Sequence, residues 1–323
     1  MELANQPGCY VWNNYFEPDE NVTWTAECSE GLAQGAGTLR EVWDAGKKSQ
    51  EKTGSLVGGK AQGRWVYRDK DGNLSEGDYE NGNKHGHWVE RLENGTVQEG
   101  PYESGERHGD WVLRFDSGTV MEGPFAAGKQ QGRWVLRFAS GNVSEGSYDA
   151  GKRHGNWVEK FVSGTVQEGP YKEGNRQGRW VLRFTSGTVM EGAFAAGKRH
   201  GHWVERYGDG GVQEGPYESG KRHGHWVERY PDGNVLEGPY EAGKEQGHWV
   251  LRLPDGGVQE GPYEAGKRHG RWVERDADGY VQEGPYEESL RQGWWVMRKK
   301  GLVVDMAYFT DGEGQWTLGR TPR

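Results

Sequence analysis

Apolar and polar residues alternate in short segments along most of the chain, and glycine-rich turns separate the segments. In one stretch, a first alternating segment covers residues 224–230 and a second covers residues 234–240. The Pro-Asp-Gly sequence at 231–233 is typical of a turn, because proline presets φ and glycine accepts a positive φ. Alternation with a period of two predicts half-buried β-strands, and the dense glycine, β-branched and aromatic residues disfavour helix.

The same pattern returns every 23 residues. Tryptophan recurs at this constant spacing 11 times, from Trp65 to Trp295. Ten glutamates, each followed by glycine, keep the same phase from Glu76 to Glu283, and an aromatic residue lies three positions after each of them. A fixed period of this length indicates a repeat architecture with one supersecondary unit per repeat. We therefore predict an all-β chain: a single elongated antiparallel β-meander of stacked 23-residue hairpins that forms a repeat rod.

The turns predict the register of this sheet. Closing the turn after Tyr230 sets Trp226 opposite Gly238. Closing the return with Tyr240 opposite Gly247 then sets Gly238 opposite the next tryptophan. Each such glycine lies between two tryptophans, where large rings cover bare backbone and stabilise it.

Alternation assigns the two faces of the sheet. One face carries Trp226, Glu228, Tyr230, Leu236 and Tyr240, and the other carries Val227, Arg229, Val235, Glu237 and Pro239. On the second face we expect Arg229 and Glu237 to be diagonal neighbours, and exposed ion pairs of this kind contribute only ~0–1 kcal/mol each. We expect the aromatic face to dominate stability, at roughly 25 cal/mol per Å² of buried apolar area.

Departures from the repeat define three segments. Residues 1–55 form an N-terminal cap with a degenerate repeat at 28–55, residues 56–298 form the array, and residues 299–323 form a last strand and a polar tail. Cys9 and Cys28 are the only cysteines and both lie in the cap. A disulfide between them would add ~3 kcal/mol and would indicate an oxidising compartment. The alternative is a pair of buried free thiols in a cytosolic protein.

Composition narrows the function classes. The formal net charge of −9 argues against a general nucleic-acid-binding protein, which usually has a basic footprint. Apolar residues make up 33% of the chain, and no apolar stretch is long enough to span a bilayer. No signal peptide is evident at Met1. Too few residues lie outside the array for an independent catalytic domain, so we expect a chain that is not an enzyme.

Two motifs resemble a known repeat family. The segments 235–244 (VLEGPYEAGK) and 214–224 (EGPYESGKRHG) resemble the MORN repeat, whose unit is also about 23 residues. Bacterial MORN-like variants, including the antitoxin-type YwqK repeats, are similar in placing tryptophan where eukaryotic copies have glycine. The resemblance covers residues 56–298 and implies an elongated antiparallel sheet that acts as a scaffold for protein contacts, sometimes at membranes. The opening with Cys9 and Cys28 also resembles exported bacterial MORN proteins. The first tyrosine of the eukaryotic motif is replaced here, so phosphoinositide binding is not carried over to any residue.

Motifs that resemble catalytic or metal sites have simpler explanations. The pairs His85/His87, His200/His202 and His223/His225 each share a strand face, but neighbouring repeats lie ~9.6 Å apart, too far to complete a zinc shell. We expect solvated histidines at the loop edge. The Asp-x-Asp-Gly sequences at 69–72 and 276–279 lack the downstream glutamate of a calcium loop, and we expect ordinary turns. No cofactor, metal site or nucleophile–base pair is predicted.

The aromatic face is the candidate binding surface. Either its rings only fill the sheet face, or part of it stays exposed and follows an extended polymer or a partner strand. The candidate residues are Trp88, Trp111, Trp134, Trp157, Trp180, Trp203, Trp226, Trp249, Trp272, Tyr102, Tyr148, Tyr171, Tyr217, Tyr240 and Tyr263. Basic loop pairs such as Lys152-Arg153 and Lys221-Arg222 follow one edge, and we expect them to be solvated.

The sequence thus predicts a non-enzymatic repeat scaffold for protein–protein interaction or structural assembly. One alternative is binding of a polysaccharide or a cell-envelope or membrane component along the aromatic face. Another is antitoxin-like neutralisation of a protein partner. Open sheet edges favour self-association. The expected location is periplasmic or secreted, with the cytoplasm as the alternative.

Overall fold

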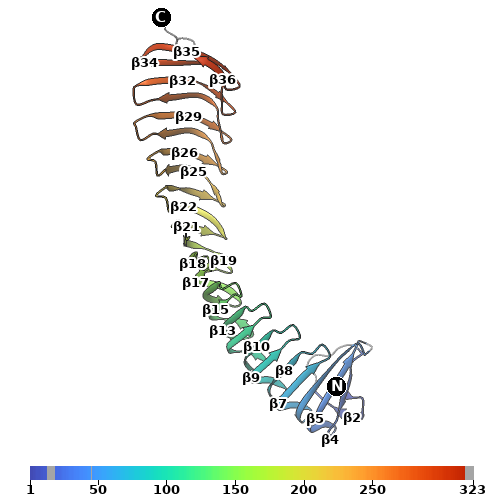
Figure 1. The fold of residues 1–323 in the computed structure, drawn as a ribbon. Helices are drawn as coiled ribbons and strands as arrows, with labels where there is room; N and C mark the ends of the chain where they lie inside the picture. Colours follow the sequence, from blue (N-terminus) through green and yellow to red (C-terminus); the bar gives the residue numbers. More distant parts are fainter. Residues whose placement is uncertain (13–18, 45, 317–323) are drawn as a thin grey trace. The chain divides into compact units, whose positions relative to one another are not determined.

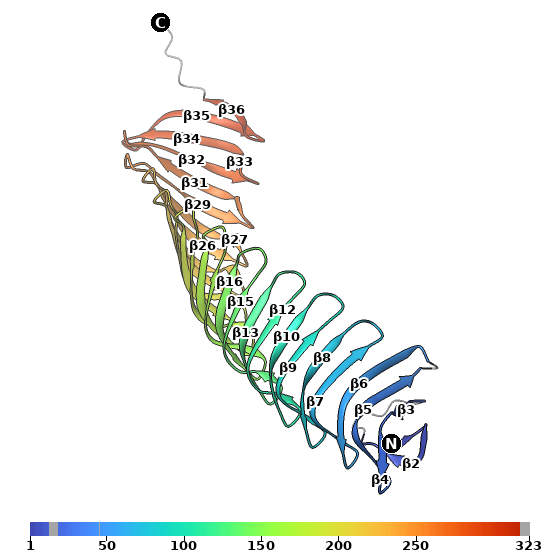
Figure 2. The same ribbon diagram turned by 60° about the horizontal axis from the view of Figure 1, so that its bottom comes forward.

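The computed structural model describes residues 1–12, 19–44 and 46–316, and these are all-β. The strands form one long open antiparallel sheet in which successive hairpins lie side by side (Figures 1 and 2). The prediction of a β-meander is therefore confirmed. Contacts divide the chain into two compact units, Met1–Val162 and Ser163–Arg323, which are described in turn.

The N-terminal unit contains the cap and the first repeats. Its strands are β1 (Glu2–Leu3), β2 (Gln6–Tyr10), β3 (Asn21–Trp24), β4 (Glu27–Ser29), β5 (Leu32–Trp43), β6 (Lys48–Val57), β7 (Lys60–Asp69), β8 (Leu74–Glu80), β9 (Asn83–Arg91), β10 (Val97–Glu103), β11 (Glu106–Arg107), β12 (Gly109–Arg114), β13 (Val120–Ala126), β14 (Lys129–Gln130), β15 (Gly132–Arg137), β16 (Val143–Asp149) and β17 (Lys152–Lys160).

The C-terminal unit contains the remaining repeats and the last hairpin. Its strands are β18 (Val166–Lys172), β19 (Asn175–Arg176), β20 (Gly178–Arg183), β21 (Val189–Ala195), β22 (Lys198–Arg206), β23 (Val212–Glu218), β24 (Lys221–Arg222), β25 (Gly224–Arg229), β26 (Val235–Glu241), β27 (Lys244–Glu245), β28 (Gly247–Arg252), β29 (Val258–Glu264), β30 (Lys267–Arg268), β31 (Gly270–Arg275), β32 (Tyr280–Glu287), β33 (Leu290–Arg291), β34 (Gly293–Lys299), β35 (Leu302–Thr310) and β36 (Glu313–Trp316).

The cap completes the sheet with a tryptophan from a different strand. Strands β5 and β6 form the degenerate hairpin, in which Gly37 pairs with Gly54 where a repeat would have a tryptophan. Trp24 of β3 packs beside this gap, is fully buried, and stacks on Trp65 with ring centroids 6.3 Å apart. A disulfide joins Cys9 to Cys28, as predicted. The cap therefore supplies from outside the repeat the ring that the degenerate hairpin lacks.

Within each repeat the first hairpin has the predicted register. Trp226 pairs with Gly238, and Gly224 pairs with Tyr240. Gly233 closes the turn with φ of 87°, so only a residue without a side-chain penalty at positive φ fits there.

The predicted register of the return holds at the tryptophan, where Gly146 pairs with Trp157, but it is wrong at the tyrosine because the strand contains a β-bulge. Tyr240 pairs with Glu245 instead of Gly247. The bulge is resolved in full in β16 and β17, where Gly146 pairs with Trp157 but the next residue, Ser147, pairs with His154. Gly155 lies inside this bulge with φ of 64°. The glycine two residues before each tryptophan is thus required by the bulge conformation, which the alternation of apolar and polar residues does not reveal.

The C-terminal end forms a hairpin where we predicted a single strand. Strand β35 pairs with β34, and β36 pairs with β35 across a turn at Asp311 and Gly312. The proposed polar tail falls on residues 317–323, outside the described part of the chain. Among the described residues, no helix has the length and apolar character needed to cross a membrane.

Candidate interaction face

Eight of the 11 repeat tryptophans are enclosed between bare backbone and a cation, whereas Ala61, Gln130 and Glu245 stand at the position of the cation before Trp65, Trp134 and Trp249. The Trp226 indole is 0% exposed, and its N–H donates to the Pro216 carbonyl at 2.9 Å. On one side the ring lies against Gly215, where an added Cβ would come within 2.4 Å of Cδ2 of the indole. On the other side, the Arg222 guanidinium lies 4.2 Å from the ring centroid. The cation and the close backbone contact together seal the indole from solvent.

Tyrosine and phenylalanine rings link successive tryptophans. The Tyr240 ring meets Trp226 edge-on at 6.0 Å and Trp249 edge-on at 5.1 Å between centroids. The same alternation occurs in both units, with phenylalanine at Phe125 and Phe194. Edge-to-face pairs at these distances add about 0.5–1.5 kcal/mol beyond their buried area. The aromatic residues therefore form a continuous packed core within each unit.

The predicted binding residues lie on this face, but their indoles are enclosed. The tryptophans from Trp88 to Trp272 are 0–2% exposed. Tyr217 and Tyr240 are buried, whereas Tyr102, Tyr148, Tyr171 and Tyr263 are half-buried. An extended ligand would therefore meet the cations and the tyrosine edges, and it would not meet the indole rings.

Buried glutamates organise the polar groups above the rings. Glu228 is 5% exposed and accepts hydrogen bonds from Arg222 at 2.7 Å, Tyr230 at 2.7 Å and Tyr240 at 3.2 Å. Burial, and then the negative charge of Glu228, raise the pKa of Tyr240. Burial and Glu205 likewise raise the pKa of Tyr207 to about 12. The phenols therefore stay protonated and act as donors to these carboxylates.

In the N-terminal unit, the glutamate at the same repeat position as Glu228 is Glu90, and the pKa of its carboxyl is lowered. Burial of Glu90 raises the pKa of its carboxyl, but the charge of Lys84, 2.7 Å away, and of Arg107 lowers it further than burial raises it. Arg107 belongs to the following repeat, so this pair joins adjacent hairpins. Glu90 is thus held as a carboxylate that fixes two cations over the aromatic core.

Sequence analysis missed a row of half-exposed apolar residues on this face. These side chains lie four residues after each of the eight consecutive tryptophans from Trp88 to Trp249, and the hydroxyls of Tyr207 and Tyr230 reach the buried glutamates from there. In the other three repeats the position holds Asp69, Asp276 and Lys299. In the N-terminal unit the row is Leu92, Phe115, Phe138 and Phe161, and in the C-terminal unit it is Phe184, Tyr207, Tyr230 and Leu253. We call these residues the apolar row. Their shared 23-residue spacing is the signal in the sequence that identifies them.

The opposite face carries ion pairs, with partners that differ from the prediction. Arg229 donates to Glu214 of the preceding repeat at 2.6 Å, and not to Glu237. Glu237 instead accepts from Arg252 of the following repeat. The pair therefore crosses from one hairpin to the next. By register Arg229 is diagonal to Glu237, as predicted, but it is equally diagonal to Glu214, and the contact forms with Glu214. The pairs are exposed, so each adds only ~0–1 kcal/mol.

The motifs that resemble metal sites belong to loops and turns. Oδ1 of Asp69 accepts hydrogen bonds from the amides of Asp71 and Asn73, both at 3.0 Å, which confirms a turn. His85 lies 3.5 Å from Glu80, and His223 lies 3.6 Å from Glu218. The described residues contain no group of three or more potential ligands that could hold a metal ion.

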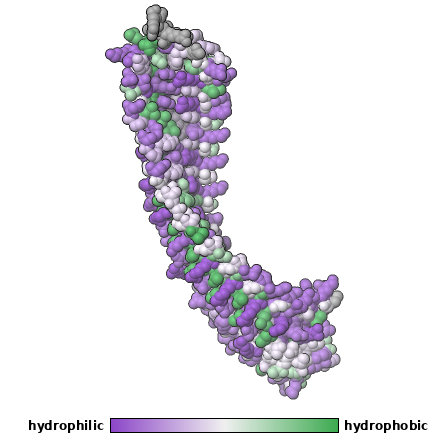
Figure 3. Space-filling view, in the orientation of Figure 1, coloured by the Kyte–Doolittle hydropathy of each residue, from purple (hydrophilic) through white to green (hydrophobic). Residues whose placement is uncertain are grey.

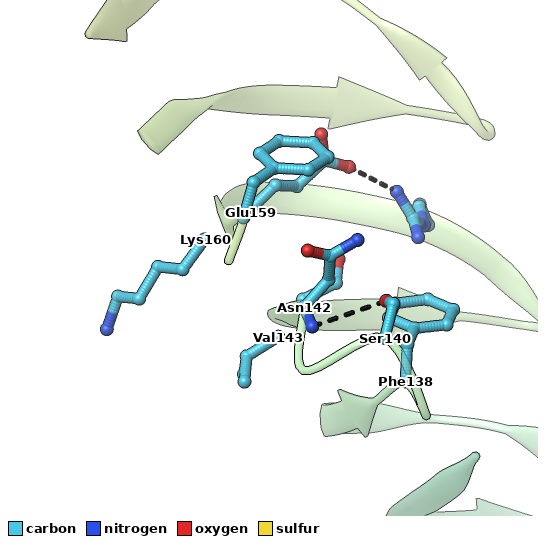
Figure 4. Close-up of a pocket in the computed structure, with 9 residues that line it drawn as sticks. Phe138, Ser140, Asn142, Val143, Glu159 and Lys160 are labelled. Carbon is cyan, nitrogen blue, oxygen red and sulfur yellow. Dashed lines mark hydrogen bonds and ion pairs between the residues drawn. The ribbon is translucent and has the colours of Figure 1, made fainter. Parts of the chain in front are cut away.

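A cavity opens on the aromatic face of the N-terminal unit, beside the apolar row (Figure 4). Its volume is about 240 Å³, and its walls come from β16, β17 and the adjoining turns. In Figure 4 the Phe138 ring and the Glu159 carboxylate lie on either side of Asn142, and Glu159 is paired with Arg153 at 2.7 Å. Elsewhere, small apolar patches alternate with polar side chains over the surface in view (Figure 3).

Comparisons with known proteins give structural neighbours only. No family model matches the chain, and no curated protein matches it. Among solved structures it is similar to the TCP domain of SAS-4 (dCPAP) from Drosophila melanogaster, solved in complex with a proline-rich motif of Ana2 (dSTIL), at 13% identity and a TM-score of 0.30, over 48% of this chain and 84% of that one.

Two further solved structures are similar. One is the TCP10c domain of Drosophila melanogaster Sas-4, at 13% identity and a TM-score of 0.27, over 48% of this chain and 93% of that one. The other is a streptogramin B lyase, at 11% identity and a TM-score of 0.16, over 84% and 88%. At these TM-scores none of the three supports an argument about function.

Proposed function

We propose that this chain is a non-enzymatic repeat scaffold, of MORN-like type, that binds a protein partner along its apolar row. The observation that carries the proposal is the row itself: half-exposed apolar side chains recur in eight consecutive repeats, from Leu92 to Leu253, on a face whose larger rings are buried. Repeat arrays present such regularly spaced positions to partners, and exposed apolar sets mark interfaces.

The packing of the indoles favours a protein partner over a polysaccharide. A sugar ring stacks on a broad accessible aromatic face, and the repeat tryptophans offer none because they are 0–2% exposed. The smaller rings of the apolar row are only half-exposed. The charged groups beside the row are already paired, as in Arg222 with Glu228. What remains accessible is an apolar margin, which suits the apolar side chains at the centre of a protein interface.

A site-specific crosslink tests this proposal. A photoreactive phenylalanine analogue replaces Phe138 in the apolar row, and in a matched variant it replaces Arg137, the neighbouring residue whose exposed side chain lies on the opposite face. In the native source, we expect one protein to crosslink at Phe138 and not at Arg137. Crosslinking at Arg137 alone, or to glycan alone at Phe138, would overturn the proposal. A crosslinked toxin would specify the scaffold as a neutralising antitoxin.

We also propose a periplasmic or secreted location. The supporting observation is the Cys9–Cys28 disulfide, which is compatible with an oxidising compartment. Mass spectrometry of protein alkylated in its native compartment should find both cysteines oxidised. Two alkylated thiols would assign the chain to the cytoplasm.

A further inference from the structure

The face opposite the aromatic core changes character in the last hairpin, which β34 and β35 form near the C-terminal end of the sheet (Figure 1). In the ten earlier repeats the residue before each tryptophan is arginine, histidine, aspartate or asparagine, whereas in β34 it is Trp294. The glutamate that forms an ion pair in every earlier repeat, from Glu76 to Glu283, is replaced by Met306. Two residues further on, Tyr308 replaces a proline, serine, alanine or aspartate. The last hairpin thus has large apolar side chains where the earlier hairpins have ion pairs.

Four of these side chains form an exposed patch. Trp294 is 57% exposed and Tyr308 is 55% exposed, although the repeat tryptophans are 0–2% exposed. The two residues pair across the strands, and their rings meet edge-on with centroids 5.2 Å apart. Val303, which is 46% exposed, and Met306 lie on the same face of β35. We call Trp294, Val303, Met306 and Tyr308 the terminal patch, and exposed apolar sets of this kind mark an interface.

Charged residues of opposite sign lie at the two ends of the terminal patch. Lys299 and Lys300 lie at the turn that joins β34 to β35, whereas Asp311 and Glu313 lie at the turn that joins β35 to β36. Lys300, Asp311 and Glu313 are exposed. A second copy that faces this surface, turned end for end, places its lysines over the acidic turn of the first. The surface is therefore complementary in charge to itself.

We propose that the terminal patch binds a second copy of this chain, face to face, in a two-fold symmetric dimer. The axis lies between the two faces and crosses the strands near the paired residues Val296 and Met306. The two exposed rings of one copy then pack on Val303 and Met306 of the other, and the same contacts recur across the axis. The other two-fold arrangement, with like ends facing, would bring lysine onto lysine and is disfavoured. Because one hairpin supplies each side, the interface is small, and we expect a dissociation constant in the micromolar range.

Sedimentation velocity of the full chain over a range of concentrations tests the dimer. We expect the wild-type sedimentation coefficient to rise from the monomer value to the dimer value as concentration increases. Trp294→Arg should raise the dissociation constant about 100-fold or more, because each copy loses a central aromatic anchor. Arginine suits this position, since Arg271 occupies it in the preceding repeat, and circular dichroism confirms that the variant folds. Val162→Arg, at a turn residue that is 76% exposed, is the matched control and should leave the dimer unchanged.

A pair of charge variants tests the orientation of the two copies. Lys300→Glu places a glutamate over the acidic turn of the second copy, and Asp311→Lys places a lysine over its basic turn. Each variant alone should dimerise several-fold more weakly than wild type. An equimolar mixture should dimerise about as tightly as wild type, because every end contact then joins opposite charges. The substitutions suit their sites, since Lys300, Asp311 and Glu288 all occupy left-handed turn positions, with φ of 48°, 51° and 50°.

The proposal is overturned if the wild-type chain stays a monomer at every concentration. It is also overturned if the dimer survives Trp294→Arg, because the copies would then associate elsewhere, such as along the edge of β36. A mixture that dimerises no better than either charge variant would overturn the proposed orientation. The apolar row is tested separately, since the crosslinking experiment places its probe at Phe138 in the N-terminal unit.

Discussion

At the scale of single residues, glycine and tryptophan meet at every contact between repeats. The Trp249 ring lies so close to Gly238 that an added Cβ would come within 2.2 Å of the indole Cδ2. The indole is rigid, and its N–H is fixed by the Pro239 carbonyl at 3.0 Å. A side chain at this glycine would therefore displace the ring or separate the strands.

Gly238→Ala should accordingly destabilise the protein by about 1–3 kcal/mol, the usual cost of overpacking a dense core. Urea unfolding followed by circular dichroism measures the change. Glu237→Ala, one residue away on the exposed face, should cost no more than ~1 kcal/mol because it removes only a surface ion pair. Equal effects of the two substitutions would contradict the assigned close contact.

A second residue-scale feature is an alanine with a left-handed backbone. Ala242 has φ of 50° in the return turn, and Gly243 follows it with φ of 91°. Left-handed geometry costs a residue with Cβ roughly 1–2 kcal/mol, and asparagine tolerates it better than alanine. The same turn has Asn81 in an earlier repeat.

Ala242→Asn should therefore stabilise the protein by about 0.5–1 kcal/mol, because asparagine is less strained at this φ. The midpoint of urea unfolding should rise with an unchanged slope. Ala126→Asn, in the strand before an equivalent turn, serves as the control and should not stabilise. A lower midpoint for Ala242→Asn would show that the alanine is not strained.

Much of this residue-scale detail could be predicted from the sequence. The 23-residue phase of glycine and tryptophan predicts the Trp226–Gly238 pairing, because register follows directly from the turn length. The left-handed turn residue could not be predicted, since alanine at Ala242 gives no signal of positive φ. The burial of the indoles could not be predicted either. It depends on where long loop side chains such as Arg222 lie, and the alternation of apolar and polar residues does not determine the conformation of such side chains.

At the scale of the hairpin, a buried ion pair joins strand and loop. Arg222 comes from the short strand β24 and covers Trp226, and it also pairs with Glu228 on β25. Burial lowers the pKa of Arg222, but its hydrogen bonds to tyrosine hydroxyls and the charge of Glu228 raise this pKa by more than burial lowers it. The pKa of Arg222 is therefore raised overall. The repeat with Gln130 and Leu136 replaces both charged residues by neutral ones. In each of the five repeats with glutamate at the position of Glu228, lysine or arginine stands at the position of Arg222, whereas arginine also occurs beside a neutral residue, as Arg107 does with Leu113. The array therefore never places the buried carboxylate without its cation.

Arg222→Gln should destabilise by about 1.5–3 kcal/mol, because a buried carboxylate loses its charged partner. Adding Glu228→Leu should recover most of this loss by reproducing the neutral repeat. A double-mutant cycle in urea measures the coupling. Arg229→Gln is the control, with an expected cost of ~0–1 kcal/mol for an exposed pair. If the changes in the free energy of unfolding of the two single variants simply add up in the double variant, Arg222 and Glu228 do not act as a unit.

At the scale of the hairpin, the sequence correctly predicted the strands. It did not predict the β-bulge or the partners of the exposed ion pairs. Alternation fixes which residues share a face, as Glu228 and Tyr230 do. It does not specify where a strand inserts extra residues, and the bulge at Gly155 shifts the return pairing. The cavity beside Phe138 was also missed, because a space between neighbouring turns is visible only once the pairing of their strands is known.

At the scale of the whole molecule, each hairpin is stabilised mainly by its neighbours. Ring contacts and cross-strand ion pairs join adjacent repeats, and the cap and the last hairpin cover the terminal rings, with Trp24 on Trp65 and Phe309 beside Trp295. In such a molecule stability is approximately a sum over repeats and their interfaces. The number of repeats is then free to vary if the register is kept.

Deleting residues 207–229 removes one full repeat and joins Arg206 to Tyr230, which restores the original Arg-Tyr sequence. We expect this variant to fold, with a free energy of unfolding lowered by about the contribution of one repeat. Circular dichroism and urea unfolding provide the measurement. Deleting residues 207–218, about half a repeat, should prevent folding of the C-terminal unit because it leaves a strand without its hairpin partner. Similar stability of the two deletions would exclude repeat-by-repeat packing.

The alternating rings have an optical consequence. Within each unit, successive repeat indoles are linked by an intervening ring about 5–6 Å from each, as Tyr240 links Trp226 to Trp249. Excitation absorbed by one indole will pass to its neighbours before emission, so fluorescence anisotropy will be low even though the side chains are rigid. Intrinsic fluorescence then reports an average over many tryptophans and does not report an event at one repeat.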